Sequence, residues 1–415
     1  MTTLLLAFQS LLAALVGYLL LLTAAAWRAP RRTPPAAANA RRHRFAILIP
    51  AHNEERLLPG LLANLRQLAY PADAVAIHVV ADNCTDRTAA VAAAHGATVH
   101  ERTHATLRGK GYALQWLINR LWETAVPPDA FVILDADSVV SPNFLQVMDA
   151  RLARGERAVQ AYYAVRAPEQ SGSAALRYAA LAVLHYLRPQ GRMRLGASAG
   201  LKGNGMVFAA DLLRQHAWSA SLTEDIEYHM QLILAGERVT FAPDAVVWAE
   251  MPDTLAAAHS QNVRWEQGRL DMVRQYVPRL LARACRERNF VLFDAAVEQI
   301  IPPFSILAGL SLLGFAAAVV LPTPRRRLSR RLALFTLAGQ VVYLFAGLRL
   351  AHAPAAAYRA LLGAPRFLAW KIALYGRILL GHRAQAWVRT DRNTNETPIP
   401  ANHTAQKEKN PRPSA

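Results

Sequence analysis

The sequence is poor in cysteine, in lysine and in acidic residues. Its 415 residues include two cysteines, Cys84 and Cys285, and neither has neighbours typical of a metal site. We therefore expect no disulfide framework and no zinc site. The 29 acidic residues are outnumbered by 47 lysines and arginines, which leaves a net charge of +18. Long apolar runs are also few, so the hydrophobic content of 53% predicts a globular domain with a few membrane segments.

The positive charge is carried almost entirely by arginine and lies mostly outside the central region. The arginine clusters lie at 28–44, 269–288, 325–331 and 359–392. Such a basic chain is typical of nucleic-acid binding, but no RNP-like or helix-turn-helix signature accompanies the clusters. Each cluster instead flanks an apolar stretch, which favours attraction to anionic lipid. We expect a membrane partner and no nucleic acid.

Three segments are candidates for membrane-spanning helices. Residues 4–27 are uncharged and long enough to cross a bilayer, and arginines follow them while no charge precedes them. This asymmetry predicts an external N-terminus, with the next domain on the cytoplasmic face of the inner membrane. Residues 300–321 and 332–350 are the other two candidates. The arginine-rich loop between them would then lie outside, against the positive-inside rule.

Between residue 45 and about residue 250, predicted strands alternate with predicted helices. This order indicates an α/β fold with a mostly parallel sheet covered by helices. The expected strands are 45–50, 75–82, 97–101, 131–137, 158–165 and 239–250, and the expected helices are 54–68, 85–95, 111–123 and 223–235. The predicted organisation begins with a membrane helix at 1–27, a basic linker at 28–44 and an α/β domain at 45–290. Two membrane helices at 291–350 and an interfacial helical segment at 351–390 follow, and the latter includes the amphipathic stretch 367–380. The predicted chain ends in a disordered tail at 391–415.

The apolar strand 131–134 leads directly into two aspartates, Asp135 and Asp137. In open α/β sheets, ligands bind beyond the carboxyl ends of the strands. If the strand continues through the two aspartates, their side chains share one face. Paired carboxylates there suit a divalent cation that also holds a diphosphate. The alternative is a strand end followed by an ordinary helix cap.

Two further loops carry residues with plausible chemistry. Asp82 ends another apolar strand at the same expected sheet edge, where its carboxylate can accept hydrogen bonds from a base or a ribose. Lysine is scarce between residues 45 and 290, where only Lys110 and Lys202 occur, both in glycine-flanked loops. A glycine-rich loop entering a helix suits a phosphate, so Lys110 is a candidate phosphate ligand.

Two motifs follow nearer the C-terminus. Thr223, Glu224 and Asp225 begin a predicted helix, where the acids either favour the helix dipole or supply a general base. Gln261, Arg264 and Trp265 are spaced to share one helix face. An amide, a guanidinium and an indole make a poor apolar core stripe and a plausible clamp for a diphosphate and a sugar.

The order of these motifs resembles the family 2 glycosyltransferases. The ordered motifs are P-A-H-N-E-E, A-D-N-C-T-D, G-K-G-Y-A-L, D-A-D, T-E-D and Q-N-V-R-W, and the resemblance covers roughly residues 45–269. More closely, they are similar to the membrane-bound, cellulose-synthase-like branch with its D, DxD, TED and QxxRW motifs. The resemblance implies a GT-A fold, a nucleotide-sugar donor and inversion at the anomeric carbon.

The resemblance also implies roles for individual residues. Pro50, Ala51, Glu54, Asp82, Lys110 and Asp135 would bind the nucleotide; Asp137 with Asp135 would hold Mg²⁺ or Mn²⁺; Asp225 would be the base beside Glu224; and Gln261, Arg264, Trp265 and Asn204 would hold the diphosphate and the acceptor. The donor would be a UDP-sugar, of glucose or N-acetylglucosamine, and the acceptor a lipid, a lipid-linked saccharide or an oligosaccharide. Two alternatives are a polyprenyl-phosphate sugar transferase and a non-catalytic membrane adaptor.

Overall fold

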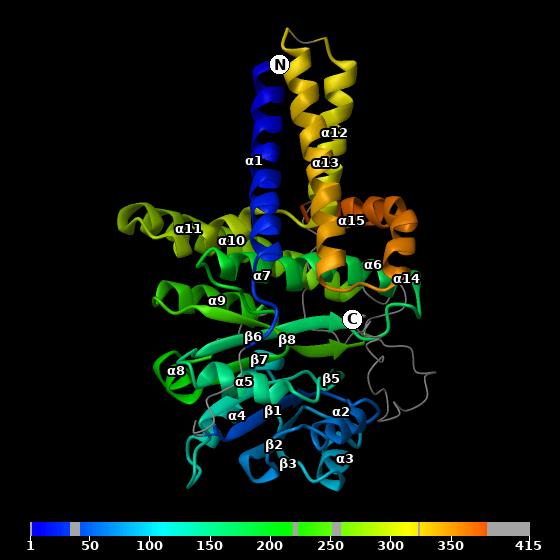
Figure 1. Cartoon of the computed structure of the whole chain (residues 1–415). Helices are drawn as coiled ribbons and strands as arrows, with labels where there is room; N and C mark the ends of the chain where they lie inside the picture. The colour runs from blue at the N-terminus through cyan, green and yellow to red at the C-terminus, as the bar shows by residue number, and fades with distance from the viewer. Residues whose placement is uncertain (1, 34–41, 219–222, 251–258, 323, 380–415) are drawn as a thin grey trace, which may run out of the picture.

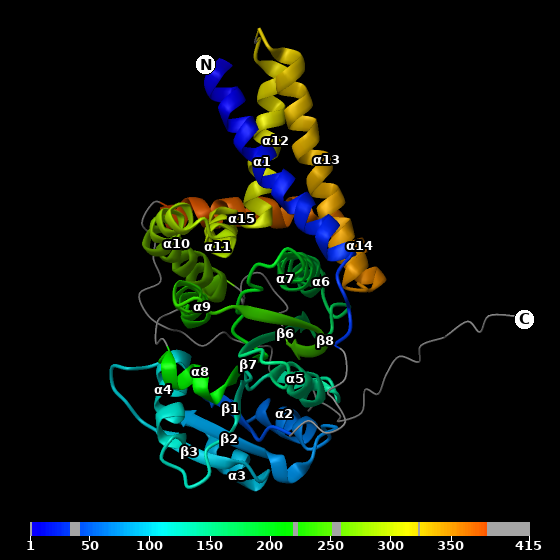
Figure 2. The same ribbon diagram turned by 60° about the vertical axis from the view of Figure 1, so that its left-hand side comes forward.

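The computed structural model describes residues 2–33, 42–218, 223–250, 259–322 and 324–379. A sheet-based α/β domain lies at one end of the molecule and a bundle of long helices projects from the other (Figure 1). Further helices lie between the two, across the direction of the bundle (Figures 1 and 2).

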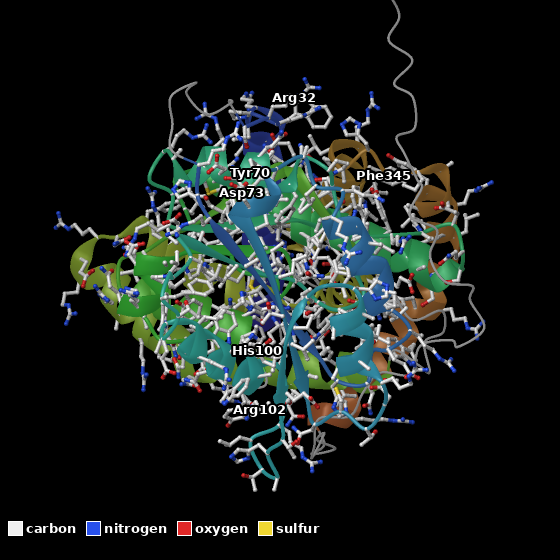
Figure 3. The ribbon with its side chains drawn as sticks, turned by 90° about the horizontal axis from the view of Figure 1, so that it is seen from below. Arg32, Tyr70, Asp73, His100, Arg102 and Phe345 are labelled. Atoms are coloured by element: carbon white, nitrogen blue, oxygen red, sulfur yellow. The ribbon has the colours of Figure 1, made fainter. Side chains whose placement is uncertain are left out.

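The described strands form one eight-stranded sheet in the order β3-β2-β1-β4-β7-β6-β8-β5. The first four strands in this order are parallel, whereas β7 pairs antiparallel with both β4 and β6, and β5 pairs antiparallel with β8. Figure 3 views this domain from below and labels His100 and Arg102 of the edge strand β3. The strands are β1 (Phe45–Ala51), β2 (Val75–Asp82), β3 (Thr98–Arg102), β4 (Ala130–Ile133), β5 (Ser138–Val140), β6 (Ala158–Val165), β7 (Met206–Ala209) and β8 (Val239–Ala249).

Helices cover both faces of the sheet, which explains why its central strands are continuously apolar. Side chains alternate between the two faces: Phe45, Ile47 and Ile49 join one core, and Ala46 and Leu48 join the other. The first core is completed by α2 (Leu58–Leu65), α3 (Thr88–Ala94) and α5 (Phe144–Leu152), and the second by α4 (Lys110–Leu121), α8 (Ala210–Gln215) and α9 (Glu224–Leu234).

The bundle consists of α1 (Thr2–Trp27), α12 (Phe304–Val320) and α13 (Arg326–Leu350). Two of its helices, over Thr3–Trp27 and Arg326–Leu350, are long and apolar enough to cross a membrane, and α11 (Phe290–Ile300) with α12, bent by 72° at their junction, forms a third candidate. Polar side chains tie the helices together: Gln9 donates to the Gly314 carbonyl at 2.9 Å and accepts from Ser329 at 2.8 Å. The arginine-rich start of α13 lies at the same end as the N-terminus, away from the sheet (Figures 1 and 2).

The α/β domain is packed closely against this bundle through α6 (Gly172–Leu181), a π-helical turn η2 (Ala182–Leu187) and α7 (Arg188–Arg194). A Cβ on Gly191 would lie 2.4 Å from the Leu22 carbonyl oxygen, and one on Gly347 would lie 2.4 Å from the Val183 side chain. Glycine at both positions allows the two parts to touch. The remaining helices, α10 (His259–Glu287), α14 (Ala355–Ala360) and α15 (Ala364–Leu379), lie between them.

Several predicted boundaries are wrong. The strand expected over 131–137 ends at Ile133, because the chain turns there: the Ser138 amide donates to the Asp135 carbonyl at 3.1 Å. The helices expected from residues 54 and 85 begin at Leu58 and Thr88 instead. The proposed tail at 391–415 lies outside the described residues.

Candidate active site

A continuous cavity of about 1420 Å³ connects the edge of the sheet with the helices of the bundle. At one end it is lined by the loops that follow β1, β2 and β4, and at the other by side chains of α12, α13 and α15. The predicted site residues that line it are Pro50, Ala51, Glu54, Asp82, Lys110, Asp135, Asp137, Glu224, Asp225 and Trp265. The structure thus brings these separate motifs into one space.

Asp135 and Asp137 lie in the turn between β4 and β5, and both line the cavity. Asp137 is buried, with 6% of its surface exposed. The turn is held by Asn204, whose Oδ1 accepts from the Asp135 amide at 3.2 Å and whose Nδ2 donates to Ser138 Oγ at 2.8 Å. The paired carboxylates therefore share one space because of a turn, and not because an extended strand aligns them.

Asn204 has a different place from the one the sequence predicts. The resemblance predicts a place near the acceptor, but the Asn204 side chain is fully buried and is not among the residues that line the cavity. Its backbone carbonyl also accepts from Gln160 at 2.8 Å. Asn204 acts on the site by positioning the aspartate turn.

Lys110 begins α4 directly after Gly109, which has a φ of 112° that suits glycine. Its Nζ lies 2.6 Å from Asp135 Oδ1 and also donates to the Gly203 carbonyl. Burial acts to lower the pKa of this ammonium, but the carboxylates of Asp135 and Glu224 outweigh it and raise the pKa above its ordinary value. Lys110 is therefore a permanent positive charge beside the aspartate turn.

Asp82 is buried at the end of β2 and lines the cavity beside the loop after β1. An ion pair with Arg102 of β3 holds its carboxylate, and the Asp82 carbonyl contacts His52 Nδ1 at 2.7 Å. Arg102 has no signal in the sequence, because nothing in a five-residue edge strand singles out one arginine. Glu54, in the loop after Pro50 and Ala51, is anchored through its amide to Thr88 Oγ1 at 2.8 Å.

Glu224 and Asp225 form the first turn of α9, and Thr223 occupies the N-cap position without a capping side-chain bond. Burial raises the pKa of both carboxyls, and that of Glu224 reaches about 7, because the Asp225 charge adds to the effect of burial while Lys110 opposes it. A Cβ on Gly203 would lie 3.3 Å from Asp225 Oδ2 and 3.9 Å from Lys110 Nζ, and the φ of Gly203 is 79°. The glycine loop therefore closes on these two charges.

Helix α10 carries three residues of the predicted clamp, Gln261, Arg264 and Trp265. Trp265 lines the cavity, is 39% exposed and lies under the Arg177 guanidinium, 5.8 Å from the ring centre. The side chains of Gln261 and Arg264 lie outside the described residues, so their roles stay predictions. Gly268 allows α10 to reach the start of α9, since a Cβ there would lie 2.2 Å from the Thr223 methyl group.

The aspartate turn has the donor chemistry of a divalent-cation site. Two carboxylates supply hard oxygen ligands, which Mg²⁺ and Mn²⁺ prefer. Among the residues with described placement, no group of three histidine, cysteine, aspartate or glutamate side chains could hold a metal ion. The turn thus fits a cation whose remaining ligands come from a bound diphosphate or water.

Comparison with known proteins supports a family assignment. The family model described as "Glycosyltransferase like family 2" matches residues 43–268, which is more than half of the chain. The chain is 23% identical over 261 residues to the probable glycosyltransferase YdaM of Bacillus subtilis (strain 168), covering 60% of each chain. It is 30% identical over 139 residues to the 4,4'-diaponeurosporenoate glycosyltransferase of Staphylococcus haemolyticus (strain JCSC1435), covering 31% of this chain and 35% of the relative. The matches therefore span less than two thirds of these relatives.

A solved structure supports the fold. The mannosyltransferase PcManGT from Pyrobaculum calidifontis, in complex with GDP-Man and Mn²⁺, aligns with a TM-score of 0.53 at 20% identity, covering 82% of this chain and 99% of that one. The predicted GT-A fold is thereby confirmed, with a mostly parallel sheet and candidate membrane helices beside it. The chain is an enzyme of glycosyltransferase family 2.

Proposed function

We propose that the protein is an inverting, membrane-associated glycosyltransferase of the cellulose-synthase-like branch. It would transfer glucose or N-acetylglucosamine from UDP to a lipid, a lipid-linked saccharide or an oligosaccharide, in the synthesis of a cell-surface glycan or glycolipid. The observation that carries this proposal is the continuous cavity, which joins Asp82 and Asp137 to Asp225 and then to the membrane helices.

The arrangement supports a direct displacement. The acceptor hydroxyl oxygen bonds to C1 of the donor sugar while the bond from C1 to the diphosphate oxygen breaks, and the nucleoside diphosphate leaves with the electron pair. Asp225 takes the hydroxyl proton, and its raised pKa makes it a stronger base than an exposed aspartate. Mg²⁺ or Mn²⁺ bound by Asp135 and Asp137 would neutralise charge on the leaving diphosphate.

The residues of this chain also position the donor. Asp82, held by Arg102, would accept hydrogen bonds from the uracil or ribose, beside Pro50, Ala51 and Glu54. Lys110 would contact the diphosphate, since it lies next to the aspartate turn. Trp265, with Gln261 and Arg264 of the same helix, would hold the diphosphate and the acceptor sugar.

A nucleotide panel tests the donor. The purified full chain, in a neutral detergent with Mn²⁺, is heated with UDP, GDP or ADP, and the midpoint of thermal unfolding is followed. We expect UDP to raise the midpoint most, because a ligand that binds only the folded state stabilises it by mass action. Equal or larger shifts with GDP or ADP would refute the UDP proposal. Conversion of UDP-glucose or UDP-N-acetylglucosamine to UDP is then measured in the presence of membrane extract.

A further inference from the structure

The membrane-side half of the cavity is lined by more cationic side chains than carboxylates. Its lining includes Arg188, Arg192, Lys202 and Arg269, with Glu298 among them. Arg188 pairs with Glu298 at 3.3 Å, and Arg192 pairs at 2.6 Å with Asp294. Both partners come from α11, so these two pairs join α7 to the helix that precedes α12.

Two of these cations have no such partner within the described part of the chain. No described carboxylate lies within ion-pair distance of Lys202 or Arg269, and the hydrogen bond found for the Arg269 side chain goes to the Gln299 backbone carbonyl, at 3.3 Å. Burial lowers the pKa of Lys202 to about 8 and also lowers the pKa of Arg269. The nearby His229 adds no charge, since burial holds its pKa well below the ordinary value. An excess of positive charge in a buried space is costly unless an anion enters it.

The glycine loop at 200–205 separates this charge from the catalytic carboxylates. On one side, Gly203 closes on Asp225 and Lys110. On the other, a Cβ on Gly200 would lie 3.6 Å from Arg192 Nη1 and 3.6 Å from Lys202 Nζ. The loop therefore touches the catalytic pair at Gly203 and the cations at Gly200.

The same half of the cavity continues into apolar surface. Its lining includes Phe304 and Leu312 of α12, Leu344 of α13 and Leu368 of α15. Leu312 is 48% exposed, on a helix that carries no charged residue. A chain of methylene groups that starts at the cations would thus reach the lipid-facing surface at α12.

We propose that this half of the cavity binds an anionic group, a phosphate or a carboxylate, of an amphiphilic acceptor whose apolar tail leaves the cavity beside α12. Lys202 and Arg269 hold the anion, and Arg188, which is already paired, borders it. The inference that this ligand is an acceptor rests on the proposed transferase function. Binding of the anion itself requires no turnover. It narrows the acceptor class to membrane amphiphiles with a negative charge.

Direct binding tests the subsite. The full chain is placed in phosphatidylcholine nanodiscs, and the affinities for dodecyl phosphate, dodecanoate, dodecanol and inorganic phosphate are measured by microscale thermophoresis. We expect dodecyl phosphate or dodecanoate to bind at least tenfold more tightly than both dodecanol and inorganic phosphate, because the anion and the tail each contribute. The tighter of the two amphiphiles identifies the anion. Equal affinity for dodecanol, or for inorganic phosphate, would overturn the proposal.

Matched variants locate the anion. Lys202→Gln and Arg269→Gln should each lower the affinity for the tighter of the two amphiphiles, dodecyl phosphate or dodecanoate, by tenfold or more. A tenfold change corresponds to about 1.4 kcal/mol. Arg279→Gln is the control, since Arg279 lies on the same helix as Arg269 but is exposed. Lys202→Arg should restore most of the affinity. Unchanged amphiphile binding in both glutamine variants would overturn the proposal.

The donor site must be unaffected. UDP affinity should stay within twofold in Lys202→Gln and Arg269→Gln, and a parallel loss of UDP binding would assign the cations to the donor diphosphate instead. Lys202 and Arg269 are half-buried and lack an ion-pair partner in the described part of the chain, so removing either charge should not lower the unfolding midpoint. Folding is checked in the same samples. If no nucleotide sugar is turned over while the anion still binds through Lys202, the proposed function fails and the subsite stands.

Discussion

Replacing Asp225 with asparagine separates a catalytic base from a helix cap. Asp225 lies in the first turn of α9, where backbone amides of Asp225 and Ile226 favour its ionised form. Asparagine keeps a side-chain oxygen for such amides, so loss of a capping role would cost at most about 1 kcal/mol. Burial also raises the pKa of Asp225, which means that its charge is costly in the folded protein. The neutral variant should therefore unfold at an equal or higher temperature at neutral pH.

The effect on transfer should be much larger than the effect on stability. Asparagine cannot take the proton of the acceptor hydroxyl, and loss of a positioned base typically slows a reaction by about 10²–10⁴-fold. UDP affinity should be retained, because the base contacts the acceptor and not the nucleotide. The assay measures UDP affinity, transfer rate and unfolding midpoint on the same Asp225→Asn preparation. Near-normal transfer, or loss of UDP binding together with transfer, would refute the assignment and turn attention to Glu224.

The pH dependence supplies a second readout of the same pair. A carboxyl whose pKa is raised on folding stabilises the protein at low pH, and this stability is lost as the pH rises through the folded pKa. For Glu224 the window runs from about 4.5 to about 7. Glu224→Gln should remove this decline in the unfolding midpoint. It should also move the acid limb of the transfer rate to lower pH, because the Glu224 charge no longer opposes ionisation of Asp225. An acid limb that stays in place would contradict this coupling.

Three further predictions concern the aspartate turn, the glycine loop and the membrane orientation. Asp137→Asn should abolish the Mn²⁺-dependent gain in UDP affinity. The loss should be smaller in Asp135→Asn, because Lys110 already pairs with Asp135 at 2.6 Å. Wild-type UDP affinity that is the same with and without chelator would contradict this. Gly203→Ala should reduce turnover tenfold or more without loss of UDP binding, since its Cβ would lie 3.3 Å from Asp225 at a φ of 79°; wild-type turnover would refute the close approach. Cys285, which is exposed on α10, should react with a membrane-impermeant maleimide in inverted vesicles and not in intact cells; labelling of intact cells would refute the predicted cytoplasmic face.

The parallel half of the sheet and its loops are accessible to sequence reasoning. Strands buried on both faces are continuously apolar, and parallel strands carry their loops to a common edge. This places Asp82 and Asp135 together without any knowledge of the fold. The assignment of Glu224 to the same space came from the resemblance of motifs, since an acidic first turn is common to many helices.

Other parts of the site have no local signal. The strand Met206–Ala209 has four residues and follows a glycine-rich loop, so neither its existence nor its antiparallel pairing with β4 and β6 can be read from periodicity. The arginine cluster at 269–288 predicts that Arg269 lies at the membrane surface, but it lines the cavity. Its direction depends on how α10 packs against Thr223 through Gly268, which is a tertiary contact.

We propose centrally that transfer of the sugar requires a divalent cation, and that the acceptor reaches the cavity from the membrane. The most direct test incubates the full chain in nanodiscs of total membrane lipid with radiolabelled UDP-glucose or UDP-N-acetylglucosamine, with Mn²⁺ or with excess chelator, and then extracts the products with organic solvent. We expect label from one donor to enter a lipid-extractable product with Mn²⁺ and not with chelator. Label that stays entirely with the nucleotide, or that is released only as free sugar or aqueous polymer, would contradict this proposal.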